Sequence, residues 1–170
     1  MTSNELQKNI KHIIQGSIIN GQNNYLTSAP NFLSSSFKTN TTITKNFQEQ
    51  SSIKKEQAQQ LIEFITTTKK WLHELSNTLQ YLTQGGEAKI YFAEDAQHVI
   101  KLNDAVYYNT WLDFLNSVLI HNLLFEDTAY QLLGFTIVDN ELLAILKQPS
   151  FSAESLCMAL KRGRTLRQVD

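Results

Sequence analysis

The chain has 170 residues, a formal net charge of −1 and 42% apolar residues, which suits one modest domain with an extension. The balanced charge gives no indication that the partner is nucleic acid or a membrane surface. A single cysteine, Cys157, excludes an internal disulfide framework and fits a reducing compartment. Because the sequence has no apolar run of about 18 residues and no signal-peptide pattern, we expect a cytoplasmic protein.

Residues 1–52 form a polar extension dominated by Asn, Gln, Ser and Thr. A segment of this composition buries little apolar surface to offset the entropy lost on ordering. Most of it is therefore expected to be mobile or only partly helical, as a linker would be. One short amphipathic helix is predicted around Leu6, Ile10, Ile13 and Ile14.

From Ile53 the pattern changes to apolar residues at mixed spacings of three and four, which favours an amphipathic helix through about residue 79. The β-branched run at 66–68 is a weak point in that helix. Two helices that meet near Thr66 to Lys69 would explain the pattern equally well.

Two strands are predicted on either side of a turn at 94–97, after a Gly-Gly pair that itself joins strand-like runs. The period of two places alternate side chains on opposite faces of each strand. In the first strand, 87–93, Ala88, Ile90 and Phe92 share one face. In the second, 97–102, Val99 and Lys101 share one face and Ile100 and Leu102 the other.

The strongest helical pattern covers residues 103–125, with Asp104 as the expected N-cap. Near its end, His121 and Asn122 are interpreted as a pair that forms hydrogen bonds at the helix terminus. Two strands follow, at 129–138 and 141–147, joined by an Asp139-Asn140 turn and ended by Pro149. The stripe expected to pack in the core comprises Tyr107, Trp111, Phe114, Leu115, Val118 and Asn122.

These elements predict an α+β fold: an antiparallel sheet of about five strands with one packed helix, preceded by helices. Their order is that of the small N-terminal lobe of a protein kinase-like fold. In that lobe a glycine turn lies over the nucleotide phosphates and a lysine on the third strand reaches the α- and β-phosphates. Gly85, Gly86 and Glu87 would form the turn, and Lys101 would be the lysine. A Gly-Gly pair also serves as a plain hairpin turn, and a strand lysine as an exposed edge residue, so both alternatives stay open.

The same scheme assigns the remaining contacts to a nucleotide, with ATP as the candidate cofactor. Ile90 would lie over the adenine, and Val99 would line the site beside the lysine. The segment Leu146–Pro149, with Lys147 and Gln148, would be the hinge whose backbone groups pair with the adenine edge. No metal site is identifiable in the sequence.

Several short segments of the sequence also resemble those of one protein family. The run GGEAKIYF…VIKLND…HNLLF…TAYQLLGF…LKQP resembles the kinase-like domain found in polyvalent proteins of bacteriophages and mobile elements, over about residues 53–150. The resemblance implies a serine/threonine/tyrosine kinase-like fold with a phosphotransferase role. On the matching positions it implies that Gly85, Gly86 and Glu87 face phosphate and that Lys101 is the phosphate lysine.

Phosphoryl transfer needs more than a small lobe. It needs an Asp that positions the acceptor hydroxyl, and an Asn and an Asp that hold Mg²⁺. After residue 149 the sequence contains neither an HxD…N loop nor a DFG-like segment, and its only aspartate there is Asp170. No catalytic residue is therefore assigned, and the rate of transfer is expected to be near background.

An active kinase also pairs the strand lysine with a carboxylate from the following helix. Asp113 is the one acid inside the predicted helix. Its position is about half a turn away from the expected core stripe. Asp113 is therefore either a solvent-exposed residue or, if the core stripe is chosen wrongly, the partner of Lys101.

The leading hypothesis is a catalytically incomplete kinase-like lobe, a binding, interaction or vestigial module with weak nucleotide affinity. The alternative is half of an active phosphotransferase whose catalytic lobe lies outside this chain, and a third reading is an α+β interaction domain that only mimics the lobe.

Residues 150–170 form a tail in which Phe151, Leu156, Met158 and Leu160 could make a helix over an uncovered apolar face. Otherwise that face predicts a second chain or self-association. The basic run 161–167 is more typical of a solvated helix end than of a nucleic-acid contact.

Overall fold

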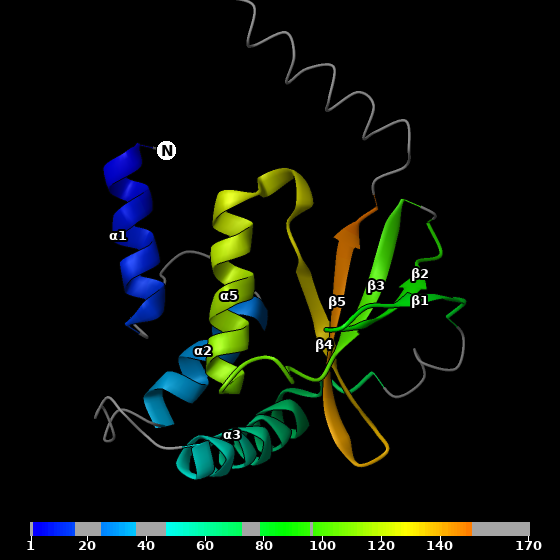
Figure 1. Cartoon of the computed structure of the whole chain (residues 1–170), viewed down its shortest axis with the longest axis horizontal. Helices are drawn as coiled ribbons and strands as arrows, with labels where there is room; N and C mark the ends of the chain where they lie inside the picture. The colour runs from blue at the N-terminus through cyan, green and yellow to red at the C-terminus, as the bar shows by residue number, and fades with distance from the viewer. Residues whose placement is uncertain (1, 16–24, 37–46, 73–78, 96, 151–170) are drawn as a thin grey trace, which may run out of the picture.

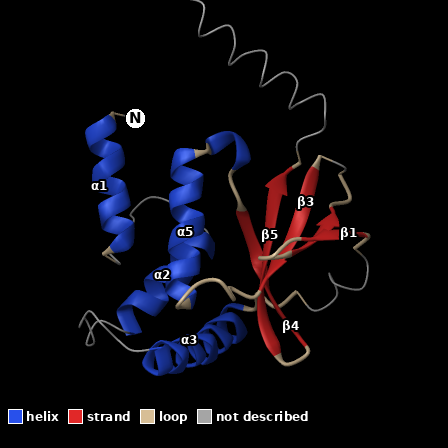
Figure 2. Cartoon of the chain, viewed as in Figure 1, coloured by secondary structure: helices blue, strands red, loops and turns tan. Residues whose placement is uncertain are grey.

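The computed structural model describes residues 2–15, 25–36, 47–72, 79–95 and 97–150 of the chain. Helices gather on one side of a five-stranded sheet (Figures 1 and 2). The tail from residue 151 on, for which a helix and a covering role were predicted, lies outside the described residues, as do residues 73–78 of the helix predicted from Ile53 to about residue 79. The elements are α1 (Ser3–Ile14), α2 (Tyr25–Ser36), α3 (Phe47–Thr68), β1 (Tyr81–Gln84), β2 (Lys89–Phe92), β3 (His98–Asn103), α5 (Trp111–Leu124), a 3-10 turn η1 (Glu126–Thr128), β4 (Gln131–Val138) and β5 (Glu141–Pro149).

The sheet is antiparallel throughout, in the order β1-β2-β3-β5-β4. The Gly85-Gly86 turn closes the β1–β2 hairpin, with the Gly85 N–H donating to the Ala88 carbonyl at 3.0 Å. The β4–β5 hairpin turns at Asp139-Asn140, where φ is 53° and 65°, as the sequence predicted. An α+β architecture with an antiparallel sheet is therefore confirmed.

The register assigns the side chains of the sheet to two faces, because residues directly opposite each other in an antiparallel pair share a face. Ile90 of β2 pairs with Lys101 of β3, and Lys101 pairs with Leu146 of β5. These three residues form one row on the face that α5 covers. On the other face Ile100, Leu102 and Ile145 form a second, smaller buried cluster, so the predicted alternation along β3 is confirmed.

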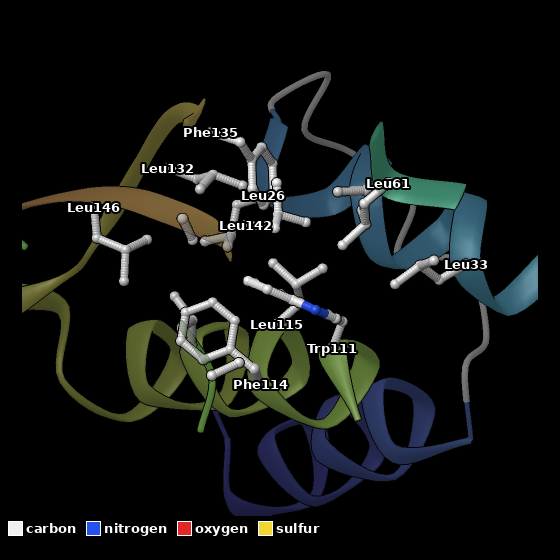
Figure 3. Packing of buried hydrophobic residues seen from close by; sticks show 14 of the residues in the cluster. Leu26, Leu33, Leu61, Trp111, Phe114, Leu115, Leu132, Phe135, Leu142 and Leu146 are labelled. Atoms are coloured by element: carbon white, nitrogen blue, oxygen red, sulfur yellow. The ribbon is translucent and has the colours of Figure 1, made fainter. Parts of the chain in front are cut away.

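The main core lies between α5 and the sheet, and helices α2 and α3 complete it (Figure 3). Side chains of α5 point toward those of β4 and β5, and leucines from α2 and α3 close the side. Each large apolar side chain buried in this way contributes about 1.5–3 kcal/mol. The core residues include Leu26, Leu33, Leu61, Ile65, Trp111, Phe114, Leu115, Val118, Leu132, Phe135, Leu142 and Leu146.

The N-terminal extension contributes more to this core than its composition predicted. The short helix expected near Leu6 is present as α1, which begins with a capping box between Thr2 and Glu5 and contacts α5. The expectation that residues 1–52 bury little apolar surface is wrong for α2. Its apolar residues recur at helical spacing among polar residues that are mostly serines, so Leu26 and Leu33 reach the core together.

Helix α3 ends at the threonine run that was predicted to be its weak point. The hydroxyls of Thr66, Thr67 and Thr68 each donate back to the carbonyl four residues earlier, at 2.7–2.9 Å. After the helix, the chain crosses the outer edge of β4, where Trp71 forms a parallel bridge with Phe135. A glycine is needed at this crossing, since a Cβ on Gly134 would lie 2.6 Å from the Lys70 carbonyl oxygen.

The start of α5 differs from the prediction. The helix begins at Trp111, where Thr110 is the N-cap and accepts the Asp113 N–H at 3.0 Å. Asp104 instead accepts the Val106 N–H at 2.8 Å in a local turn, and such side-chain turns compete with helix formation. The segment 104–110 is therefore a loop, and Tyr107, predicted to be core, is 65% exposed.

Helix α3 holds this loop and the first turn of α5 in place. The Lys54 amine donates to the carbonyls of Ala105 and Tyr108, at 2.5 and 3.1 Å. Burial lowers the pKa of Lys54, and the nearby charge of Asp104 opposes that shift. The buried amide oxygen of Gln57 accepts the Leu112 N–H at 3.0 Å. Side chains of α3 therefore satisfy both the loop carbonyls and one free amide of α5.

Replacement of Gln57 by Ala is expected to destabilise the fold by about 1–2 kcal/mol, because it leaves the Leu112 N–H without its acceptor. Urea denaturation measures the change. Gln59→Ala is the matched control, since Gln59 is exposed on the same helix and should cost less than about 0.5 kcal/mol. Equal losses in the two variants would contradict the capping role.

Asp95, at the β2–β3 turn, forms an ion pair with Lys147 of β5. The Lys147 hydrogen bond at 2.7 Å, helped by the Gln97 N–H and the His98 ring, lowers the pKa of Asp95 to about 2. Because this lies below the ordinary value of 3.8, the pair stabilises the fold above about pH 4, and the effect is lost as the pH falls toward 2.

An NMR titration of the Asp95 carboxyl should give a pKa near 2 in the natural chain and a value closer to 3.8 in Lys147→Met. Lys55→Met, which removes an exposed charge from α3, should leave the titration unchanged. A titration of Asp95 that is the same in all three proteins would show that Lys147 does not set its pKa.

Candidate functional site

A cavity of about 470 Å³ lies between α5 and the sheet, below the glycine turn. The turn contributes residues 85–88 to its lining. Ile90, Lys101 and Leu146, the row that crosses three strands, form part of its wall. The helix contributes Phe114, Ser117, Val118 and His121, and Asn103, Tyr108 and Tyr130 complete the lining.

The glycine turn is a hairpin turn and a wall of the cavity at once, so the two readings of the Gly-Gly pair are compatible. A Cβ on Gly85 would meet nothing within 4 Å, which leaves that side of the backbone open to a ligand. A Cβ on Gly86 would lie 3.1 Å from the Tyr107 hydroxyl. Tyr107, which was predicted to pack in the core, is thus exposed and lies beside the glycine turn.

Lys101 lies at the centre of the sheet and is half-buried, so it is not an edge lysine. Its amine donates to the Tyr130 hydroxyl at 3.2 Å and lies 5.1 Å from the centre of that ring. Ile90 and Leu146 flank it in the adjacent strands. Lys101 and the glycine turn line the same cavity, as the element order predicted.

Tyr130 was not singled out from the sequence, because nothing in its local pattern marks it. It lies just before β4, and the end of α5 fixes its backbone. Asn122 donates to the Tyr130 carbonyl and accepts the Tyr130 N–H, both at 2.7 Å. His121 packs on the ring at 4.7 Å and also contacts the Thr128 carbonyl at 3.1 Å. The prediction that His121 and Asn122 form hydrogen bonds at the helix end is confirmed.

Asp113 does not line the cavity. It lies in the first turn of α5 and is exposed to solvent. Among the residues that the structure describes, the cavity lining contains one carboxylate, Glu87, which comes from the glycine turn and not from the helix. The helix residues that line the cavity near Lys101 are apolar or uncharged polar groups, with His121 the one ionisable side chain among them.

Three other predicted site residues lie outside the cavity lining. Val99 is on the same strand face as Lys101 but beyond the cavity, paired with Gln148. Lys147 contacts Asp95 from the opposite face of β5. The Gln148 amide donates to the Thr128 carbonyl at 2.9 Å.

The segment predicted as a hinge is the last part of β5 and pairs with β3 from Leu146 to Pro149. Its backbone groups on that side are therefore used by the sheet. Leu146 nevertheless reaches the cavity through its side chain. The structure thus places Lys147 on the face of β5 away from Lys101, and Gln148 beside the Thr128 carbonyl, with neither residue in the cavity lining.

The described part of the chain contains neither a cluster of metal ligands nor a membrane-spanning helix. No group of three or more His, Cys, Asp or Glu side chains there is placed to hold a metal ion. No helix within the described ranges has the length and apolar character needed to cross a membrane.

Comparison with known proteins identifies a family. The family model described as the serine/threonine/tyrosine kinase found in polyvalent proteins matches residues 54–164, more than half of the chain. No curated protein and no solved structure shows significant similarity to the chain. The matched range begins in α3, at the lysine that holds the 104–110 loop, and includes the whole sheet and its cavity. The chain therefore belongs to the family of serine/threonine/tyrosine kinases found in polyvalent proteins.

Proposed function

We propose that the cavity binds the phosphates of a nucleoside triphosphate such as ATP, as the small lobe of a kinase-like domain. The observation that carries the proposal is that the Lys101 amine and the glycine turn line one cavity. The strand order β1-β2-β3-β5-β4, with α5 between β3 and β4, supports it. Membership of a kinase family supports the choice of ligand.

The chemistry of the lining fits this ligand. A volume of about 470 Å³ falls within the range of about 300–1,000 Å³ typical of small-molecule sites. Lys101 offers a cation, and Ile90, Val118 and Leu146 offer apolar surface for a base. The Gly85 N–H is used within the hairpin, so the amides of Gly86 and Glu87 are the donors expected to face the anion.

One feature opposes tight binding. The Glu87 carboxylate belongs to the same turn and repels a phosphate that approaches it. With one lysine and a few amides set against this charge, we expect weak affinity. Bound ATP would supply the transferable γ-phosphoryl group.

We further propose that residues 1–170 by themselves do not transfer that group. An acceptor-positioning Asp and Mg²⁺ ligands supply most of the barrier lowering in phosphoryl transfer. The sequence after Pro149 contains no HxD…N or DFG-like pattern that would provide them. The chain is accordingly proposed to act as a binding or interaction module.

The second candidate is half of an active phosphotransferase. What favours it is that the family match continues to residue 164, past the last strand. In that case the catalytic Asp and the Mg²⁺ ligands come from a segment outside these residues or from a second chain.

Lys101→Met is expected to weaken ATP binding roughly 10- to 100-fold, because it removes a charged donor from the phosphate site. Isothermal titration calorimetry with ATP measures the loss. Lys89→Met is the matched control, since it removes the same charge from the neighbouring strand on the face away from α5. Absence of ATP binding by the natural chain, or equal affinities in both variants, would refute the nucleotide site.

The two candidate functions differ in their expected transfer activity. With radiolabelled ATP, Mg²⁺ and a generic protein acceptor, the purified 170-residue chain should label the acceptor no faster than the Lys101→Met variant does. Labelling that is well above background and lost in Lys101→Met would establish the second candidate in place of the first.

A further inference from the structure

The position of Lys101 must be set by something other than a helix carboxylate. On the cavity side of α5, the Ser117 hydroxyl donates to the Phe114 carbonyl at 2.8 Å, within the helix itself. His121 is used by Thr128. Asp113 is exposed and outside the lining. In the described part of the chain, α5 therefore offers no acid to the lysine.

The group that contacts the amine is Tyr130. Its hydroxyl accepts a hydrogen bond from Lys101 at 3.2 Å, and its ring lies 5.1 Å from the same nitrogen. An ammonium has three donors, so one hydrogen bond leaves two for an anion. A phenol also differs from a carboxylate in that it orients the amine without neutralising it. The full charge of Lys101 stays available for a phosphate.

Tyr130 is in turn fixed by α5. The two hydrogen bonds between the Asn122 amide and the Tyr130 backbone, both 2.7 Å long, tie the residue to the end of the helix. The His121 ring packs against the tyrosine ring at 4.7 Å. A displacement of α5 would therefore move the tyrosine and, through it, the lysine.

We propose that Tyr130 is the positioning residue that holds the Lys101 amine in the cavity, and that Asn122 couples this position to α5. In active kinases a helix carboxylate provides the corresponding link between helix and lysine. Here an amide and a phenol provide it, through the backbone before β4. That this link supports nucleotide binding rests on the function proposed above. The contact between Tyr130 and Lys101 is independent of that function.

The first test uses no nucleotide. Tyr130→Phe keeps the ring and removes the hydroxyl, so the amine of Lys101 should become more accessible. The measurement is the rate at which an amine-reactive ester acylates each lysine, read by peptide mass spectrometry. Acylation of Lys101 should rise several-fold. The acylation rate of Lys54, which is half-buried and donates to the carbonyls of Ala105 and Tyr108, should stay unchanged. A rise at both lysines would indicate general loosening and would overturn the proposal.

Two variants sharpen the test. Tyr91→Phe is the matched control, since it removes a hydroxyl from a half-buried tyrosine on the other face of the sheet. It should leave acylation of Lys101 unchanged. Asn122→Ala removes both bonds to the Tyr130 backbone and should raise acylation of Lys101 as Tyr130→Phe does. Circular dichroism confirms that each variant is folded. If Lys101 reacts equally fast in the natural chain and in Tyr130→Phe, Tyr130 does not hold it.

The second test separates the phosphate site from the base site. Tyr130→Phe should weaken ATP binding about 3- to 10-fold and leave adenosine binding unchanged, because only ATP uses the lysine. If the natural chain binds no ATP but acylation of Lys101 rises in Tyr130→Phe, the nucleotide proposal fails and the positioning role stands. Equal losses for ATP and adenosine would assign Tyr130 to the general packing of the cavity and overturn the proposal.

Discussion

The pairing of β3 with β2 on one side and β5 on the other determines where the chemistry of this protein can be. Antiparallel pairing sets Ile90, Lys101 and Leu146 opposite one another, and opposite residues share a face. The amine of Lys101 is thereby directed to the side that α5 covers. A slip of one residue in either pairing would turn it to the other face, where the smaller apolar cluster lies.

Helix α5 depends on that sheet face and on α3 together. Its aromatic and aliphatic side chains fill the core, while its first turn is completed by an amide oxygen from α3. Its last turn orients the tyrosine that contacts the lysine. A continuous set of contacts therefore connects the N-terminal helices with the lysine, although none of the residues described in α2 and α3 lines the cavity.

The sequence predicted the strands better than the starts of the helices, for physical reasons. The period of two in residues 87–102 identified both the pairing and the face of Lys101, since one side of the sheet is buried. Asp104 looked like an N-cap because its local chemistry suits a cap, but the same chemistry made a turn six residues too early. The contribution of α2 was hidden by the polar composition of residues 1–52 taken as a whole, although α2 itself carries several apolar residues. Tyr130 could not be foreseen, because its role arises from contacts with residues 8 and 29 positions earlier that only the tertiary fold creates.

The two borders of the sheet differ in how they are closed to neighbouring molecules. Along β4, the chain after α3 already occupies the border through the pairing of Trp71 with Phe135. The border formed by β1 is short and solvent-facing, and its pairing with β2 shifts register between Tyr81 and Thr83. Short, bulged outer strands are poor templates for recruiting a further strand. Addition of further strands, and so growth into fibrous aggregates, is thus opposed at β4 by the chain segment that already pairs there and at β1 by the shift in its register with β2.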